Sequence, residues 1–172
     1  MSSSESDSAV IGHHRSADPA SPGTGRPDTA VSAPAQVDVR GPRLAAWITT
    51  IVLAAVLVTG FWPLLAVQAV IFALGAAFGP GASPYGLVFA RLVRPRLSPT
   101  TETEPVAPLR FAQAVGLVFA VVGVAGYAAA LPVLGAVATG IALLAALLNA
   151  ALGFCLGCQV YPLVARLTRR SA

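Results

Sequence analysis

Four long apolar runs dominate the hydrophobic pattern of this chain, and they fall into two pairs. The first pair covers residues 44–62 and 63–79, and the second covers residues 111–130 and 132–154. None of the four runs contains a charged side chain. A helix needs about 20 residues to cross a bilayer, and roughly 17 are enough. The pattern therefore predicts an all-α fold, a four-helix transmembrane bundle made of two helical hairpins.

The same order of features occurs twice along the chain. The segments RLAAWITTIVLAAVLVTGFWP and RFAQAVGLVFAVVGVAGYAAALP both begin with arginine and reach an aromatic turn followed by proline. A similar tail follows each pair of runs, SPYGLVFARLVRPRL in the first half and CQVYPLVARLTRR in the second. With both first helices running outward, this order predicts a parallel repeat whose axis lies along the membrane normal. Chance similarity in a chain so rich in Ala, Val and Leu is the alternative.

Both tails fit a short helix that lies at the cytoplasmic membrane surface, with apolar residues facing lipid and arginines reaching phosphates. In the first tail these residues are Leu87, Val88, Leu92 and Val93, with Arg91, Arg94 and Arg96. In the second they are Val160, Leu163, Val164 and Leu167, with Arg166, Arg169 and Arg170. A plain arginine anchor is the simpler alternative.

Residues 1–37 differ in composition from the rest of the chain. They are rich in Ser, Pro, Asp and Ala and show no apolar period, so they cannot bury enough surface to offset the entropy of ordering. We expect a disordered tail here, without a cleavable signal peptide, and a membrane domain over residues 38–170. His13 and His14 lack further ligands at useful spacing, so no metal site is expected.

Composition and arginine placement add a class and a topology. Of the 172 residues, 56% are hydrophobic and 10% are charged, which is typical of an integral membrane protein. All 11 basic residues are arginine, a bias that suggests bacterial, GC-rich coding. They flank the apolar runs and are not interleaved with aromatic residues, so nucleic acid binding is not expected.

Arginines precede the first run, lie between the second and third, and follow the fourth, whereas both hairpin turns are uncharged. By the positive-inside rule the N-terminus, the central loop and the C-terminus are cytoplasmic. The expected location is the bacterial cell membrane, with a multi-pass topology.

Polar groups inside the runs are few. No Asp, Glu, His, Lys or Arg occurs there, which disfavours a proton relay or an ion-coupled carrier. We expect interhelical hydrogen bonds from Thr49, Thr50, Thr59, Gln68, Gln113, Thr139 and Asn149. We expect close-packing helix faces from Gly116, Gly123, Gly135, Ala142, Ala146 and Ala150.

The only two cysteines of the chain, Cys155 and Cys158, stand three residues apart after the fourth run. Helical spacing puts both sulfurs on one face, near enough for a disulfide. In a reducing, cytosol-facing position such a pair is more often redox-active or metal-binding than structural, and zinc would need ligands from a second subunit. We therefore expect Cys155 and Cys158 to be the catalytic residues. Two cysteines that merely fill a small-residue helix face are the alternative.

The two sulfurs should differ in reactivity, because a thiolate is favoured at the N-terminal end of a helix and disfavoured at the C-terminal end. If Gly157 ends the fourth crossing and the arginine-rich helix begins near Cys158, then Cys158 is the nucleophile. Cys155 would then be its resolving partner.

Four segments, VDVRGPRLAA, SPYGLVFARLVRPRL, RFAQAVGLVF and LNAALGFCLGCQVY, together resemble a bacterial, actinobacterial-type membrane family, domain of unknown function 4395. The resemblance covers roughly residues 37–168, and its GFCLGC run is the most specific part. The family often has an acidic residue after the second cysteine, where this chain has Gln159, which puts a proton-shuttling role there in doubt. The resemblance implies a membrane protein with prominent cysteines. Sulfur-transfer and thioredoxin-like genomic neighbours favour a thiol role by association.

Three functions remain open at this point, and so does the question whether the protein is an enzyme. The first is thiol redox or sulfur transfer with a cytoplasmic thioredoxin-like or sulfurtransferase partner. The second is a structural or assembly subunit, including a homo-oligomer, that packs through its small-residue faces. The third is a facilitative pore for a small sulfur compound, lined by Gln68, Asn149 and the cysteines. No cofactor is implied, and the lipid bilayer is the surrounding partner.

Overall fold

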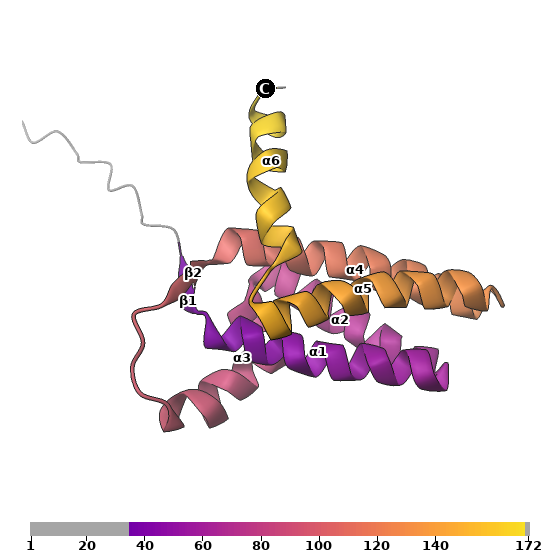
Figure 1. Ribbon diagram of the computed structural model, residues 1–172, viewed down its shortest axis with the longest axis horizontal. Coiled ribbons are helices and arrows are strands. Elements are labelled where there is room, and N and C mark those ends of the chain that lie inside the picture. The colour runs from indigo at the N-terminus through magenta and orange to yellow at the C-terminus, as the bar shows by residue number, and fades with distance from the viewer. Residues whose placement is uncertain (1–34, 171–172) are drawn as a thin grey trace, which may run out of the picture. The chain divides into compact units, whose positions relative to one another are not determined.

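The structure, a computed structural model, describes residues 35–170. That part of the chain is mainly helical, which confirms the predicted fold class (Figure 1). The predicted tail up to residue 34, with His13 and His14, lies outside the described residues. Two short strands, β1 (Gln36–Asp38) and β2 (Thr103–Pro105), were not predicted and pair antiparallel. Strand β1 takes in the last two residues of the segment predicted as tail.

Each of the four predicted apolar runs forms one helix of the bundle: α1 (Arg40–Thr59), α2 (Trp62–Phe78), α4 (Val106–Ala128) and α5 (Pro132–Leu152). Both α1 and α4 begin before the apolar run that they contain. Pro42 and Pro108 are tolerated there because the first turn of a helix leaves its N–H groups unpaired. Three of these helices, α1, α4 and α5, are long and apolar enough to cross a membrane, and α2 has 17 residues.

The long helices pack through a small apolar core and through glycines. Leu53, Val56 and Leu65 are fully buried. Close approach between α4 and α5 depends on Gly126, where a Cβ would lie 2.7 Å from the backbone nitrogen of Gly135. Gly123, Gly135, Ala142 and Ala150 are buried too. The predicted small-residue faces therefore serve packing within this chain.

Both predicted tail helices are present beside the bundle. In the first tail α3 (Pro84–Val88) continues through a π-helical turn (Phe89–Val93) and a 3-10 turn (Arg94–Arg96). Its buried apolar residue is Phe89, which packs on Gly41. The second tail forms α6 (Leu156–Arg170), which packs on α4 and runs at a steep angle to the long helices (Figure 1). The ring centroids of Tyr161 and Phe111 lie 6.0 Å apart at this contact.

The two halves of the chain repeat one order of elements, β1–α1–α2–α3 and β2–α4–α5–α6. The two strands pair with each other around Val37 and Glu104. Helix α2 of the first half packs on α4, and α5 of the second half packs on α1. If the two halves are exchanged, each of these contacts becomes the other, as expected of a repeat whose halves are related by a two-fold axis.

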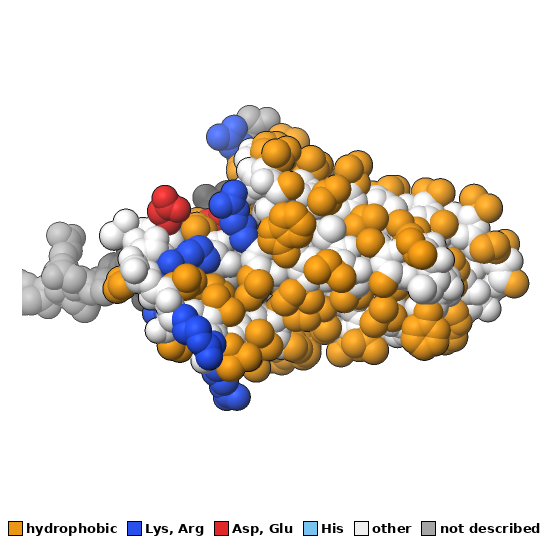
Figure 2. Space-filling model, turned by 60° about the horizontal axis from the view of Figure 1, so that its bottom comes forward, with side chains coloured by type: hydrophobic (Ala, Val, Ile, Leu, Met, Phe, Trp, Pro, Cys, Tyr) orange, Lys and Arg blue, Asp and Glu red, His pale blue; other side chains and the backbone are white. Residues whose placement is uncertain are grey.

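Charge is concentrated at one end of the bundle. The described arginines lie near the strands, at the starts of α1 and α4 and in the segments that follow α2 and α5. Figure 2 shows them gathered at that end, with apolar side chains over the rest of the visible face. We call this the arginine end; the opposite end has the two uncharged turns, at Gly60 and at residues 129–131.

Candidate functional site

The two cysteines lie at the arginine end, where α5 gives way to α6. Helix α5 ends at Leu152, and Cys155 directly precedes the first residue of α6. The structure joins Cys155 and Cys158 in a disulfide with their Cα atoms 5.2 Å apart, within the range of native disulfides. The backbone N–H of Cys158 donates to Cys155 Sγ at 3.3 Å. The predicted closeness of the two sulfurs is thus confirmed.

The predicted boundary between these helices is wrong. Gly153, with a φ of 66°, ends α5 in the left-handed conformation that suits glycine. Gly157 instead lies inside α6, and a Cβ there would be 2.6 Å from Cα of Ala112 on α4. Cys155 consequently has the place before the first turn of a helix, where N–H groups lack helical partners. This is the place that the sequence interpretation gave to Cys158.

Two arginines lie against the ends of α5 and α2. A Cβ at Gly153 would be 2.7 Å from a terminal nitrogen of Arg43, so this guanidinium packs on the turn that leads to Cys155. Arg110 has the corresponding place in the second half and donates to the carbonyl oxygens of Ala76 and Ala77 at 2.8 and 2.6 Å. Cations are favourable at helix C-termini. Arg43 therefore places a positive charge beside the turn that leads to Cys155, and the carboxyl of Glu104 is within the electrostatic reach of the same arginine.

Ser83 has the same position relative to α3 that Cys155 has relative to α6. It directly precedes α3, and its Oγ accepts the N–H of Gly86 at 3.1 Å. The same relation joins Cys155 Sγ to the N–H of Cys158. Sequence reasoning missed this correspondence, although Ser before Pro-Tyr-Gly is a typical helix N-cap signal.

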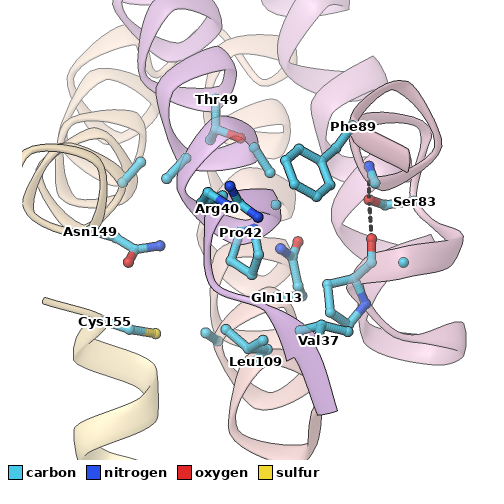
Figure 3. A pocket seen from close by; sticks show the side chains of 18 of the residues that line it. Val37, Arg40, Pro42, Thr49, Ser83, Phe89, Leu109, Gln113, Asn149 and Cys155 are labelled. Carbon is cyan, nitrogen blue, oxygen red and sulfur yellow. Dashed lines mark hydrogen bonds between the residues drawn. The ribbon is translucent and has the colours of Figure 1, made fainter. Parts of the chain in front are cut away.

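A cavity of about 750 Å³ lies between the long helices at the arginine end and reaches Cys155. Figure 3 shows Cys155 and Asn149 on one side of it and Ser83 and Phe89 on the other. Its polar or charged lining residues include Asp38, Arg40, Thr49, Gln113 and Asn149, and its larger apolar ones Phe72, Leu109, Phe119, Ile141 and Leu144. The sequence could not reveal this cavity, because residues from every long helix line it.

Asp38 and Arg40, which both line the cavity, form an ion pair. Asp38 Oδ1 accepts the backbone N–H and the Nε–H of Arg40 at 3.0 and 3.1 Å, and Oδ2 accepts from a terminal nitrogen at 2.9 Å. The same nitrogen of Arg40 donates to the carbonyl oxygen of Ser98 at 3.0 Å. This hydrogen bond connects the segment between Arg96 and β2 to the start of α1. These hydrogen bonds from Arg40 lower the pKa of Asp38. On the paired strand, burial raises the pKa of Glu104, with Arg43 acting in the opposite direction.

The polar residues of the apolar runs bear out the predicted interhelical hydrogen bonds only in part. The hydroxyls of Thr50, Thr59 and Thr139 donate to carbonyl oxygens of their own helices at 2.8, 2.7 and 2.7 Å, not across helices. An interhelical bond is made by Gln68, which is 1% exposed and accepts from the Tyr85 hydroxyl at 2.8 Å. Gln68 does not line the cavity that contains Asn149 and Cys155, so the residues proposed for a pore are not brought together.

Within residues 35–170 no cluster of three His, Cys, Asp or Glu residues could hold a metal ion. The fold and the site together define a class, a helical bundle with helices that could span a membrane and a CxxC pair at its arginine end. Residues 37–166 match the model of the family described as domain of unknown function (DUF4395). The chain belongs to this family, as the resemblance implied. Searches of curated proteins and of solved structures give no match.

Proposed function

We propose that this is a multi-pass membrane protein whose Cys155–Cys158 pair exchanges electrons with a soluble dithiol protein. One observation carries the proposal: the Cys155 sulfur lies before the first turn of α6 and accepts a backbone N–H at 3.3 Å, where it also borders a cavity. A sulfur that accepts N–H bonds at a helix N-terminus is stabilised as a thiolate, which is the reactive form. A cysteine that only fills space needs no such placement.

The exchange follows from the placement of the two sulfurs. A thiolate of the reduced partner attacks Cys155 Sγ, the Cys155–Cys158 bond breaks, and Cys158 leaves as the thiolate. The second thiolate of the partner then attacks the partner sulfur that is bonded to Cys155, and Cys155 leaves as a thiolate. The partner ends as a disulfide and this chain as a dithiol, so two electrons have moved. The reverse sequence oxidises this chain, with Cys155 as the nucleophile.

The membrane location and its orientation are part of the same proposal. Three long apolar helices support insertion, and the gathering of arginines at one end supports a cytoplasmic position for that end (Figure 2). Cys155 and Cys158 belong to this end. A soluble cytoplasmic partner of thioredoxin-like or sulfurtransferase type is therefore the class that we propose.

The test is the trapping of a mixed disulfide by matched single variants. In Cys158→Ser, the remaining Cys155 should form a stable mixed disulfide with a purified thioredoxin variant that retains only its nucleophilic cysteine, activated as its thionitrobenzoate mixed disulfide, because neither protein then has a second thiol that could break the bond. In Cys155→Ser, the same treatment should trap little. Equal trapping by both variants, or none by either, would contradict the proposal and favour a structural subunit.

A persulfide on Cys155 after incubation with a sulfurtransferase and its sulfur donor would identify sulfur transfer as the exchange. Mass spectrometry of the alkylated protein distinguishes that product from a mixed disulfide, because the added mass is one sulfur atom.

A further inference from the structure

The cavity beside Cys155 has a polar end and an apolar interior. Toward the arginine end it is lined by Asp38, Arg40 and Cys155. Farther into the bundle its walls are Phe72, Phe119 and Ile141 among others. A volume of about 750 Å³ is within the range of small-molecule sites, roughly 300–1,000 Å³. The lining thus suits an amphipathic molecule with its polar part near the sulfur.

The cavity also reaches the apolar outer surface of the bundle. Three of its lining residues, Val115, Ile141 and Leu144, are 37%, 46% and 57% exposed. They belong to α4 and α5, which approach closely at Gly126 and Gly135 near the opposite end. A molecule dissolved in the bilayer would therefore enter between these helices without passing through water.

We propose that this cavity binds a lipid-soluble quinone that accepts the electrons of the Cys155–Cys158 dithiol. The inference rests on the proposed function and names its membrane-side oxidant. A dithiol that closes to a disulfide gives up two electrons and two protons, and a quinone that becomes a quinol takes up the same number. The exposed lining on α4 and α5 is apolar at Val115, Ile141 and Leu144, which suits a carrier that travels in lipid.

Two amides are placed to orient the quinone ring. Gln113 and Asn149 both line the cavity, and Figure 3 shows Asn149 on the side of Cys155. Neither side chain makes a hydrogen bond to another residue in the described part of the chain. Their N–H groups can donate to the carbonyl oxygens of a quinone, which become hydroxyls on reduction.

The step balances in atoms and electrons. The Cys155 thiolate adds to the quinone ring, and the ring takes up a proton. The Cys158 thiolate then attacks Cys155 Sγ, the bond between that sulfur and the ring breaks, and the electron pair stays on the ring. A second proton completes the quinol, and the two cysteines are left as the disulfide. Both protons come from the original dithiol.

The experiment uses full-length protein in nanodiscs, reduced, freed of reductant and mixed with decylubiquinone without oxygen. Alkylation followed by gel shift measures disulfide formation, and absorbance measures quinol. We expect one disulfide for each quinol and a rate that saturates with quinone concentration. Quinol formation that does not saturate, or that also occurs in the Cys155→Ser variant, would overturn the inference.

Matched variants test the cavity itself. Ala145→Phe places a ring in the cavity, since Ala145 lines it, and should slow disulfide formation by about tenfold or more because the quinone loses its reacting position. Val137→Phe changes the same helix at a side chain that is 55% exposed and outside the cavity lining, and should react at the wild-type rate. A wild-type rate for Ala145→Phe would overturn the quinone site.

Equilibration of the same proteins with glutathione separates this inference from the proposed function. A pair that exchanges with glutathione but not with quinone overturns only the quinone site. A pair that exchanges with neither overturns the thiol function as well. An Ala145→Phe protein that exchanges normally with glutathione retains a folded cysteine site, so its slower reaction with quinone then reports the cavity.

Discussion

Cys155 and Cys158 differ in one respect that alkylation can test. Cys155 Sγ accepts a backbone N–H at the start of α6, whereas Cys158 supplies that N–H. In the Cys158→Ser variant, Cys155 should react with iodoacetamide at pH 7 about tenfold faster than Cys158 does in the Cys155→Ser variant, because its thiolate fraction is higher. Time courses measured by mass spectrometry give both rates. Equal rates, or a faster Cys158, would contradict this assignment of the nucleophile.

The ion pair of Asp38 with Arg40 predicts a pH dependence of stability. Hydrogen bonds from Arg40 lower the pKa of Asp38 below its ordinary value of 3.8. A carboxyl with a lowered folded-state pKa stabilises the fold above its unfolded value and loses this contribution as pH falls through the folded value. The Asp38→Asn variant should be less stable than wild type at pH 7, and the difference should shrink below pH 3.8.

Thermal unfolding in detergent at several pH values measures this difference. Burial raises the pKa of Glu104, so its contribution to stability has the opposite dependence on pH. Glu104 is present in both proteins, and its contribution therefore cancels when the stability of wild type is subtracted from that of the variant at each pH. A difference between Asp38→Asn and wild type that stays constant down to pH 3 would show that the ion pair does not contribute.

At the cysteine site, some features could be predicted from the sequence and others could not. The spacing of three residues correctly predicted that the two sulfurs meet. It could not decide which sulfur precedes α6, because Gly153 and Gly157 are both suitable helix ends and flank Cys155. Contact with Ala112 on α4 decides the matter, since Gly157 is needed inside α6 for close packing. That contact joins segments far apart in the chain.

At the scale of elements, the docking of α6 on α4 depends on Gly157. A Cβ at this position would lie 2.6 Å from Cα of Ala112, a backbone clash that a side-chain rotation cannot relieve. Gly157→Ala should therefore destabilise the docked helix by about 1–3 kcal/mol, as overpacking typically does. Thermal unfolding in detergent and the susceptibility of α6 to proteolysis measure the effect.

Gly140 in α5 is the matched control, because a Cβ there meets no atom within 4 Å. Gly140→Ala should be neutral or stabilise by up to about 1 kcal/mol through better helix propensity. If Gly157→Ala were as stable as Gly140→Ala and kept its resistance to proteolysis, the close contact between α6 and α4 would not be needed.

Apolar runs predicted the long helices well, because every bilayer-length stretch without charge became one helix. The strands β1 and β2 escaped prediction for a physical reason. Each has three residues, too few to display an alternating pattern, and each is defined only by pairing with the other across 67 positions, as Val37 with Glu104.

At the scale of the whole molecule, the arginine end predicts which side of the membrane can reach the cysteines. In sealed inside-out vesicles, a membrane-impermeant maleimide should label the reduced Cys155 and Cys158, and in right-side-out vesicles it should not. A Thr59→Cys variant made in the background of both cysteine-to-serine changes is the control. Thr59 is exposed beside the uncharged turn, so it should be labelled from the opposite side. Reversed labelling would invert the proposed topology.

The arrangement of helices was the least predictable level. Two hairpins in a row allow several packings, and the sequence did not state that α2 packs on α4 while α5 packs on α1. The cavity is a product of this packing, since its walls come from all four long helices and from the segment that contains Ser83. In the sequence, only the repeated order of similar segments indicated that the two halves are related to each other.

Redox titration measures whether Cys155 and Cys158 form a reversible redox pair. Full-length protein in nanodiscs is equilibrated in glutathione buffers of graded ratio, quenched in acid and alkylated, and the fraction of disulfide is measured by mass spectrometry. We expect one reversible transition between dithiol and disulfide, reached equally from the oxidised and the reduced side. A pair that stays in a single state across the whole range, while the denatured chain titrates normally, would contradict it.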